Sequence, residues 1–563
     1  MLKHPETAER PCASDAPRHW ADDPVEGVLR GDEIVAALEH VRGPLYVVRR
    51  GLESVVVTCA AFENARDAGD AQDQTQIFSV GALGPQALGD RAFCRAHGVR
   101  YAYVAGAMAN GIASEELVEA IGRAGMVGFF GAAGLSLERV ERAIARIQQA
   151  LGPAGHTYGF NLIHSPDDPQ LESAIAELYL RRGVRLVSAS AYLRLTLPLV
   201  RYRVSGIHRD EDGRVVAPNR VVAKVSRVEV ARQFLSPPPT EMLDELVRDG
   251  AITREQAELA QRIPLAEDLT AEADSGGHTD NRPALTLLPT MLALRDELQR
   301  AHQYASVPRI GAAGGIATPA AACAAFSMGA AYILTGTINQ ACVEAGTSDA
   351  VKQMLAEARQ ADVTMAPAAD MFEMGVKVQV LKRGTMFAIR ARKLYDLYRS
   401  CAGMDEIPPA QRTMIERDLL RCTLGEAWEQ TQAFFAARDP GQIERAQRDP
   451  KHKLALVFRS YLGQSSNWAN AGKPDRRVDY QIWCGPAMGA FNEWVRGSCL
   501  EPAGGREVAV VAMNLLVGAA ALTRANWLGA LGVALPPGAR RFEPRGADAL
   551  SEILSGAVEE CAA

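Results

Sequence analysis

Short apolar runs alternate with amphipathic stretches between residues 101 and 337 of the chain. Gly, Ser or Asn lies at or near the end of most of these runs, which is typical of a buried strand that leads into a turn. The eight runs are YAYVAGAMANG, MVGFFGAAG, TYGFNLIHSP, RLVSASAYL, VVAKVS, LTAEADSGGH, RIGAAGGIAT and AAYILTGT. The segments between them, such as SEELVEAIGRAG and SLERVERAIARIQQALG, repeat apolar residues at every third or fourth position. This spacing predicts helices with one buried face.

Strand and helix alternating eight times predict an α/β protein built on a closed (β/α)8 TIM barrel at residues 99–340. An open doubly wound sheet is the alternative, and the number of repeats favours the barrel. Active sites of such barrels lie at the carboxyl ends of the strands. We therefore expect the functional residues in the loops that follow the apolar runs.

The flanking regions have other patterns. Residues 1–98 predict an accessory region with two strands, in GPLYVVRR and GLESVVVTCAAF, followed by the polar linker ENARDAGDAQDQTQ. A long insert at residues 236–266 predicts two short helices joined at Gly250, which we expect to project over the barrel mouth. After Thr337 the strand pattern stops, and residues 341–535 predict a large helical domain. Residues 536–563 read as a polar tail.

Composition and charge narrow the classes of partner. The chain of 563 residues is 48% hydrophobic and 23% charged, with a net charge of -6, and it has no dense Lys/Arg tract. Nucleic acid and anionic membrane surfaces are therefore not expected as partners, whereas a small molecule or a protein is. The ten cysteines form no C-x-x-C pair, so neither a metal site nor a disulfide framework is expected. We find no leader-like apolar segment and no window of about 18 residues apolar enough to span a bilayer, so a cytoplasmic location is expected.

Two glycine-containing segments have the chemistry of a phosphate cradle. Gly314 and Gly315 follow the seventh predicted strand, just before a helix that opens at Thr318, and Gly336 and Thr337 follow the eighth. Backbone N–H groups can converge on a phosphate where no side chain intervenes, and a helix amino terminus adds a positive dipole end. The loops after strands seven and eight are the usual phosphate site of such barrels. The alternative is that these glycines only form tight turns.

A histidine and two polar residues are further candidates. The run Ser275–His278 ends the sixth predicted strand, and Gly277 precedes the histidine directly. An imidazole exposed at a barrel mouth can donate a proton near neutral pH, although a lone histidine is often only a structural hydrogen-bonding group. Asn161 and Lys224, at the ends of the third and fifth strands, offer an amide and a cation to a planar polar ligand. Either could equally be a solvated or internally satisfied residue.

Several segments together resemble the PfaD family, the trans-acting enoyl reductases of polyketide and polyunsaturated fatty-acid synthases. They are YAYVAGAMANGIAS, AGMVGFFGAAGL, AKVSR, EADSGGHTDNRP and DYQIWCGPAMGAFNEWVRGS. The resemblance extends from about Leu88 to about Gly532. The barrel part more distantly resembles flavin-dependent enoyl-acyl-carrier-protein reductases and nitronate monooxygenases.

The resemblance implies an FMN-binding barrel that uses NADPH or NADH to reduce the double bond of an enoyl thioester on an acyl carrier protein. It places the isoalloxazine against the backbone of Ala107, Met108 and Ala109. It assigns polar contacts with the flavin edge to Asn161 and Lys224. It assigns the phosphate to Gly314, Gly315, Gly336 and Thr337. It counts Gly277 among the cofactor-binding residues and puts His278 beside the flavin as the catalytic side chain.

Two other functions stay open at this stage. One is a flavin oxygenase of the nitronate monooxygenase type, and the other is a non-catalytic interaction protein of an assembly line. The long helical half argues against the first, because a minimal barrel would suffice for a small free substrate. The Gly-Gly and His residues argue against the second. The oligomeric state is left open, with a homodimer as one option.

Overall fold

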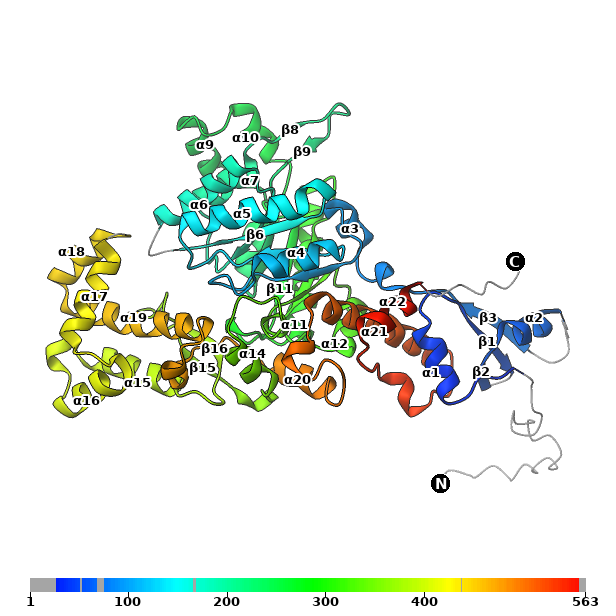
Figure 1. Ribbon diagram of the computed structural model, residues 1–563. Helices are drawn as coiled ribbons and strands as arrows, with labels where there is room; N and C mark the ends of the chain where they lie inside the picture. The colour runs from blue at the N-terminus through cyan, green and yellow to red at the C-terminus, as the bar shows by residue number, and fades with distance from the viewer. Residues whose placement is uncertain (1–26, 51–52, 68–74, 166–168, 437, 556–563) are drawn as a thin grey trace, which may run out of the picture.

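A computed structural model of the chain describes residues 27–50, 53–67, 75–165, 169–436 and 438–555. Eight parallel strands form a closed barrel at its centre (Figure 1). In chain order they are β4 (Tyr103–Ala105), β5 (Val127–Phe130), β6 (Tyr158–Ile163), β7 (Leu186–Ser190), β10 (Arg220–Val225), β11 (Asp268–Glu272), β13 (Arg309–Ala313) and β14 (Ile333–Thr335). The barrel closes where Leu334 of β14 pairs with Val104 of β4. Each strand coincides with one of the eight apolar runs to within one residue, so the predicted barrel is confirmed.

Helices surround the barrel, as the amphipathic pattern predicts. They are α4 (Glu115–Arg123), α5 (Leu137–Leu151), α6 (Pro169–Arg182), α7 (Leu197–Val204), α8 (Val228–Leu235), α11 (Ala284–His302), α12 (Pro319–Ser327) and the short α13 (Thr337–Gln340). The side chains of Ser114, Ser136 and Thr318 accept backbone N–H bonds at the amino termini of α4, α5 and α12. Such caps satisfy N–H groups that have no partner within the helix, which fixes where each helix begins.

The insert lies at the end of the barrel opposite the mouth, so its predicted position is wrong. Helix α8 returns from the carboxyl end of β10 to the amino end of β11, and the insert, with α9 (Thr240–Arg248) and α10 (Arg254–Ala260), follows it there. The backbone N–H of Leu265 donates to the carbonyl of Ser236, which closes the insert on itself. The hairpin of β8 (His208–Arg209) and β9 (Val215–Val216) lies beside it (Figure 1).

Buried charges fill the amino-terminal end of the barrel. His97 of helix α3 (Arg91–His97) and Arg309 both bond the carboxylate of Asp268, with His97 Nε2 2.8 Å from Oδ2 and Arg309 Nε 2.6 Å from Oδ1. Phe93 of the same helix stacks on Tyr332 inside the barrel. Helix α3 therefore closes this end of the barrel and belongs to it, although the sequence places residues 91–97 in the accessory region.

The carboxyl-terminal half contains two strands among its helices, where the sequence predicts helices alone. Strands β15 (Val363–Pro367) and β16 (Lys377–Leu381) form an antiparallel sheet with β12 (Gly277–His278), in the order β12-β16-β15. The helices are α14 (Asp349–Ala356), α15 (Phe387–Ser400), α16 (Pro409–Met414), α17 (Leu424–Ala436), α18 (Pro440–Arg448), α19 (Pro450–Asn470), α20 (Ala487–Trp494) and α21 (Val508–Ala530). Residues between 366 and 462 form a hydrophobic core separate from that of the barrel. We call this part, with the β15–β16 hairpin, the helical lobe.

Helix α21 joins the barrel to the chain's first elements. These are α1 (Asp32–Glu39), the sheet β2-β1-β3 made of β1 (Leu45–Arg50), β2 (Glu53–Val57) and β3 (Thr75–Val80), and α2 (Cys59–Asp67). Helix α2 and strand β3 take the two ends of the predicted polar linker, and residues 68–74 between them lie outside the described residues. Buried Arg524 of α21 donates to the carbonyls of His40 and Gly43, and burial lowers the pKa of Arg524 to about 10. After Pro536 the chain packs as well, with Phe542 and Leu550 buried and α22 (Ala547–Ser555) formed, so the residues up to 555 are no mere polar tail.

Helix α21 also corrects the expectation about membrane spans. Within the described ranges it is the one helix long and apolar enough to cross a bilayer, but 78% of its apolar window is buried inside the protein. Its contacts with α1 and α12 are those of a core helix.

Candidate active site at the barrel mouth

Four polar side chains line the inside of the barrel near its carboxyl end. Asn161 on β6 donates from Nδ2 to the hydroxyl of Ser190 and to a backbone carbonyl of β7, both at 3.0 Å. Lys224 on β10 donates from Nζ to Oε1 of Glu272 on β11, at 2.7 Å. Asn161 is buried, whereas Lys224 and Glu272 are partly exposed. A charged pair and an amide therefore meet at the floor of the mouth.

The loop after β4 presents backbone to the same mouth. Ala107, Met108 and Ala109 are half-buried, and the loop is held by Asn110 N–H, which donates to the Ala133 carbonyl at 2.7 Å. Gly131 in the next loop lies so close that a Cβ there would be 1.7 Å from the Met108 carbonyl oxygen. Only glycine allows this approach, which fixes the position of the Met108 backbone.

The glycines after β13 and β14 differ in their surroundings. Gly314 and Gly315 both have left-handed backbone, with φ of 85° and 76°. A Cβ on Gly314 would lie 2.6 Å from the carbonyl carbon of Ala273, whereas one on Gly315 or Gly336 would meet nothing within 4 Å. Gly314 therefore serves close packing of two loops, and the open side of the cradle is at Gly315 and Gly336.

The Ser275–His278 run is packed against residues from later parts of the chain. A Cβ on Gly276 would lie 2.9 Å from Thr337 Oγ1 and 3.0 Å from the backbone nitrogen of Gly485. Buried Gln379 of β16 donates from Nε2 to the carboxylate of Asp274 and to the Ser275 carbonyl, at 2.8 and 2.7 Å. This crowding explains why residue 276 is glycine, whereas Gly277 has open surroundings and a positive φ of 81°. The Gln379 bonds connect the run to residues more than 100 positions away.

His278 bonds a carboxylate of the helical lobe. Its Nε2 lies 3.1 Å from Oδ1 of Asp370, in the loop between β15 and β16, and the two side chains are 37% and 50% exposed. Burial alone would lower the pKa of His278, but the carboxylates of Asp370 and Glu272 raise it above its ordinary value against the opposing charge of Lys224. The pKa of Asp370 is lowered, because the bond with His278 outweighs the effect of burial. The imidazole is thus biased towards its protonated form.

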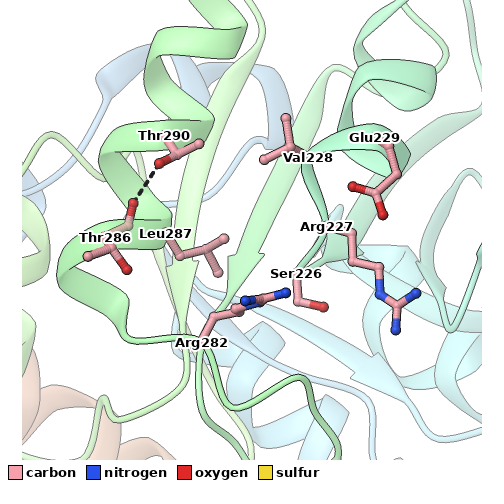
Figure 2. Close-up of a pocket in the computed structure, with 8 residues that line it drawn as sticks. All are labelled: Ser226, Arg227, Val228, Glu229, Arg282, Thr286, Leu287 and Thr290. Atoms are coloured by element: carbon pink, nitrogen blue, oxygen red, sulfur yellow. Dashed lines mark hydrogen bonds between the residues drawn. The ribbon is translucent and has the colours of Figure 1, made fainter.

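A cleft of about 360 Å³ opens on the rim of the mouth, between the amino-terminal ends of α8 and α11 (Figure 2). Arg227 bonds both carboxylate oxygens of Asp280 at 3.0 Å, and Ser226 Oγ bonds the same carboxylate at 2.6 Å. Arg282 projects into the cleft beside Ser226 (Figure 2). In the part of the chain that the structure describes, its guanidinium makes no hydrogen bond or ion pair, so the cleft holds a cation without a bonded partner.

The structure brings the predicted residues to one end of the barrel, and their roles as ligands stay predictions. The charges of Lys224 and Glu272 both act on His278, which places the three at one site. Sequence reasoning missed Ser190, Glu272, Asp370 and Gln379. Glu272 lies six residues before His278, near the end of the sixth predicted strand. This position could have indicated that it belongs to the site. Asp370 and Gln379 come from strands that were not predicted.

Two family models match the chain. The nitronate monooxygenase family matches residues 93–394, which is more than half of the chain. The inserted helical domain of [acyl-carrier-protein] S-malonyltransferase matches residues 401–480, most of which lie in the helical lobe.

Curated relatives and a solved structure agree with these matches. The chain is 46% identical over 530 residues to one of the polyunsaturated fatty acid synthase subunits of Thraustochytrium sp. (strain ATCC 26185 / S-3), covering 93% of this chain and 34% of that protein. It is 47% identical over 437 residues to the polyketide biosynthesis protein PksE of Bacillus subtilis (strain 168), covering 78% of this chain and 56% of PksE. The chain thus spans about a third to just over half the length of these relatives.

The structural match covers almost a whole domain. The enoyl reductase domain of MlnA, from the macrolactin biosynthesis cluster of Bacillus amyloliquefaciens, is 41% identical, with a TM-score of 0.75. The match covers 78% of this chain and 99% of that domain. The chain therefore belongs to the nitronate monooxygenase family and, within it, to the PfaD group of enoyl reductase domains.

Proposed function

We propose that the chain is a trans-acting, cytoplasmic enoyl reductase that uses FMN and NADPH or NADH to reduce the α,β-double bond of an enoyl thioester. The observation that carries the proposal is the barrel mouth, where a histidine biased towards protonation lies near the Lys224–Glu272 pair. The chain also matches an enoyl reductase domain over almost the whole length of that domain. A reductase of this kind needs a proton donor beside a bound hydride carrier.

The residues present fit a flavin mononucleotide. The open side of Gly315 and Gly336 gives room for a phosphate, and Thr318 caps a helix that begins just beyond Gly315. The backbone of the loop after β4 offers a flat surface to a ring system. Asn161 and Lys224 would hold polar ring atoms. When bound, FMN would supply the transfer of a hydride from the nicotinamide to the substrate.

The chain's own residues would then orient the substrate and move one proton. The β-carbon of the enoyl group accepts a hydride, and the α-carbon accepts a proton, so the double bond becomes a single bond. His278 would donate this proton and recover it from solvent. The Lys224–Glu272 pair at the floor of the mouth would stay ionised throughout the reaction, because each group stabilises the charge of the other.

An acyl carrier protein is the partner that we infer. The relatives are named as parts of polyketide and polyunsaturated fatty-acid synthases, and the helical lobe matches a domain family named for an acyl-carrier-protein transferase. The rim cleft with Arg282 would suit the phosphate ester of a pantetheine arm that passes into the mouth. The insert at residues 236–266 is excluded as a docking surface near the mouth, since it lies at the other end of the barrel.

Anaerobic mixing tests the proposal. The purified protein should be yellow, release FMN on denaturation, and lose its flavin colour rapidly when mixed with NADPH or NADH. Added enoyl thioester on a carrier protein should then restore the colour and yield the saturated product. A flavin that is not bleached by either nucleotide, yet is bleached by a nitronate, would point to an oxygenase instead. Protein that binds no FMN would refute the proposal.

A further inference from the structure

His278 is held in place by the helical lobe rather than by the barrel. It stands on the two-residue strand β12, which pairs with β16, so that Gly277 lies opposite Gln379 and His278 opposite Val378. In the described ranges β12 has no other strand neighbour. The backbone of His278 is therefore positioned by the β15–β16 hairpin, which begins about 85 residues later in the sequence.

The same hairpin supplies the partner of the imidazole. Asp370 lies in the loop between β15 and β16, and its Oδ1 is 3.1 Å from His278 Nε2. The other ring nitrogen, Nδ1, makes no hydrogen bond within the part of the chain described. One ring nitrogen is thus bonded to the lobe, and the other can still bond a ligand.

The charges around the imidazole come from three elements. Asp370 of the hairpin and Glu272 of β11 favour the protonated ring, and Lys224 of β10 opposes it. Glu272 is already bonded to Lys224 at 2.7 Å, so these two largely offset one another at the ring. Asp370 is left as the charge that the ring contacts directly.

We propose that Asp370 is the positioning residue of His278: it accepts the Nε2–H bond, turns the ring so that Nδ1 faces the barrel mouth, and makes the helical lobe part of the active site. The inference rests on the proposed function. In the reaction, Nδ1–H gives its proton to the α-carbon, and the ring keeps Nε2–H on Asp370 until solvent returns the lost proton. Without Asp370 the neutral ring could carry its proton on either nitrogen.

Three variants test whether Asp370 orients the imidazole of His278 or only stabilises the fold. Asp370→Asn keeps an acceptor oxygen but removes the charge, Asp370→Ala removes both, and Asp370→Glu is the conservative rescue. Glu373→Gln is the matched control. It removes a carboxylate from the same loop, but this carboxylate pairs with Arg459 at 3.2 Å and not with His278. FMN content and the rate of flavin reduction by the nicotinamide should be unchanged in all four.

The rate of the half-reaction with the enoyl thioester should differ among the Asp370 variants. Because both side chains are more than a third exposed, we expect the charge of Asp370 to favour the protonated ring by about 1.4- to 5-fold. Above the pH at which the ring titrates, Asp370→Asn should slow this half-reaction by about that factor, and at lower pH the rates should converge. Asp370→Ala should be slower at every pH, and Asp370→Glu should recover most of the rate.

A second measurement does not depend on catalysis. The imidazole signal of His278, assigned by its loss in His278→Gln, should titrate at lower pH in Asp370→Asn than in the parent or in Glu373→Gln. An unmoved titration and pH profile would overturn the inference. If the parent protein reduces no enoyl thioester, the proposed function fails, but a shift of the histidine titration would still establish the contact, and its absence would refute it.

Discussion

Replacing Gly314 or Gly315 by alanine should have different consequences, although both residues have the same backbone conformation. Left-handed backbone costs an L-residue about 1–2 kcal/mol, and this cost applies at both positions. At Gly314 the new Cβ would also lie 2.6 Å from the Ala273 carbonyl carbon, and relieving such crowding costs about 1–3 kcal/mol more. We therefore expect the free energy of unfolding to fall by about 2–5 kcal/mol for Gly314→Ala and about 1–2 kcal/mol for Gly315→Ala.

The affinity for FMN should separate the two variants in another way. At Gly315 the methyl group enters the open side of the cradle, where the phosphate is proposed to lie, so the Kd for FMN should rise about tenfold or more, which corresponds to about 1.4 kcal/mol. Gly250→Ala is the matched control, because Gly250 also has positive φ, 68°, and open surroundings, but lies in the insert. Chemical denaturation and fluorescence titration with FMN measure both quantities. Equal losses of stability at 314 and 315, or an unchanged Kd in Gly315→Ala, would refute the reasoning.

Three further predictions concern the histidine, the buried charges and the rim. His278→Ala should retain FMN and its reduction by NADPH or NADH, while enoyl reduction slows by about 10²- to 10⁴-fold; stopped-flow records of the two half-reactions check this, and equal losses in both would mean that His278 positions the cofactors instead. Asp268→Ala should lower the free energy of unfolding by about 3–5 kcal/mol, because it leaves Arg309 buried without its partner. Burial would raise the pKa of Asp268, but His97 and Arg309 hold it well below its usual range. The stabilising effect of the Asp268 carboxylate is therefore complete above about pH 5 and is lost as acid is added. Urea melts at several pH values test this, and Asp268→Ala should lack that dependence. Arg282→Ala should raise the KM for a carrier-bound or phosphopantetheine thioester several-fold and leave that for an N-acetylcysteamine thioester unchanged, and a change in both or in neither would argue against a phosphate contact.

The barrel was predictable because its signal is local. Each strand is a short apolar run with its own turn, and the strand ends put Asn161 and Lys224 at the mouth without any knowledge of contacts. The side on which the insert lies was also predictable. A helix after a parallel strand must return to the strand's starting end, so residues 236–266 had to leave from there.

The rest of the site depends on pairing between distant segments. Strand β12 has two residues, too few to show any period, and it forms only because β16 lies beside it. Strands β15 and β16 have five residues each, among helices that dominate the pattern of that half. Hence Asp370 and Gln379 could not be assigned to the mouth from the sequence, and the glycines at 276 and 485 gave no sign that they touch one another.

The amino-terminal elements of the described chain are fastened to its carboxyl-terminal segment, where α1 lies near α22 (Figure 1). Arg42 Nη1 donates to the carbonyl of Leu554 at 2.8 Å, and Arg545 bonds Glu39 at 2.8 Å. A cut or deletion in either segment would therefore weaken the packing of the other, although 512 and 506 residues separate the bonded partners along the chain.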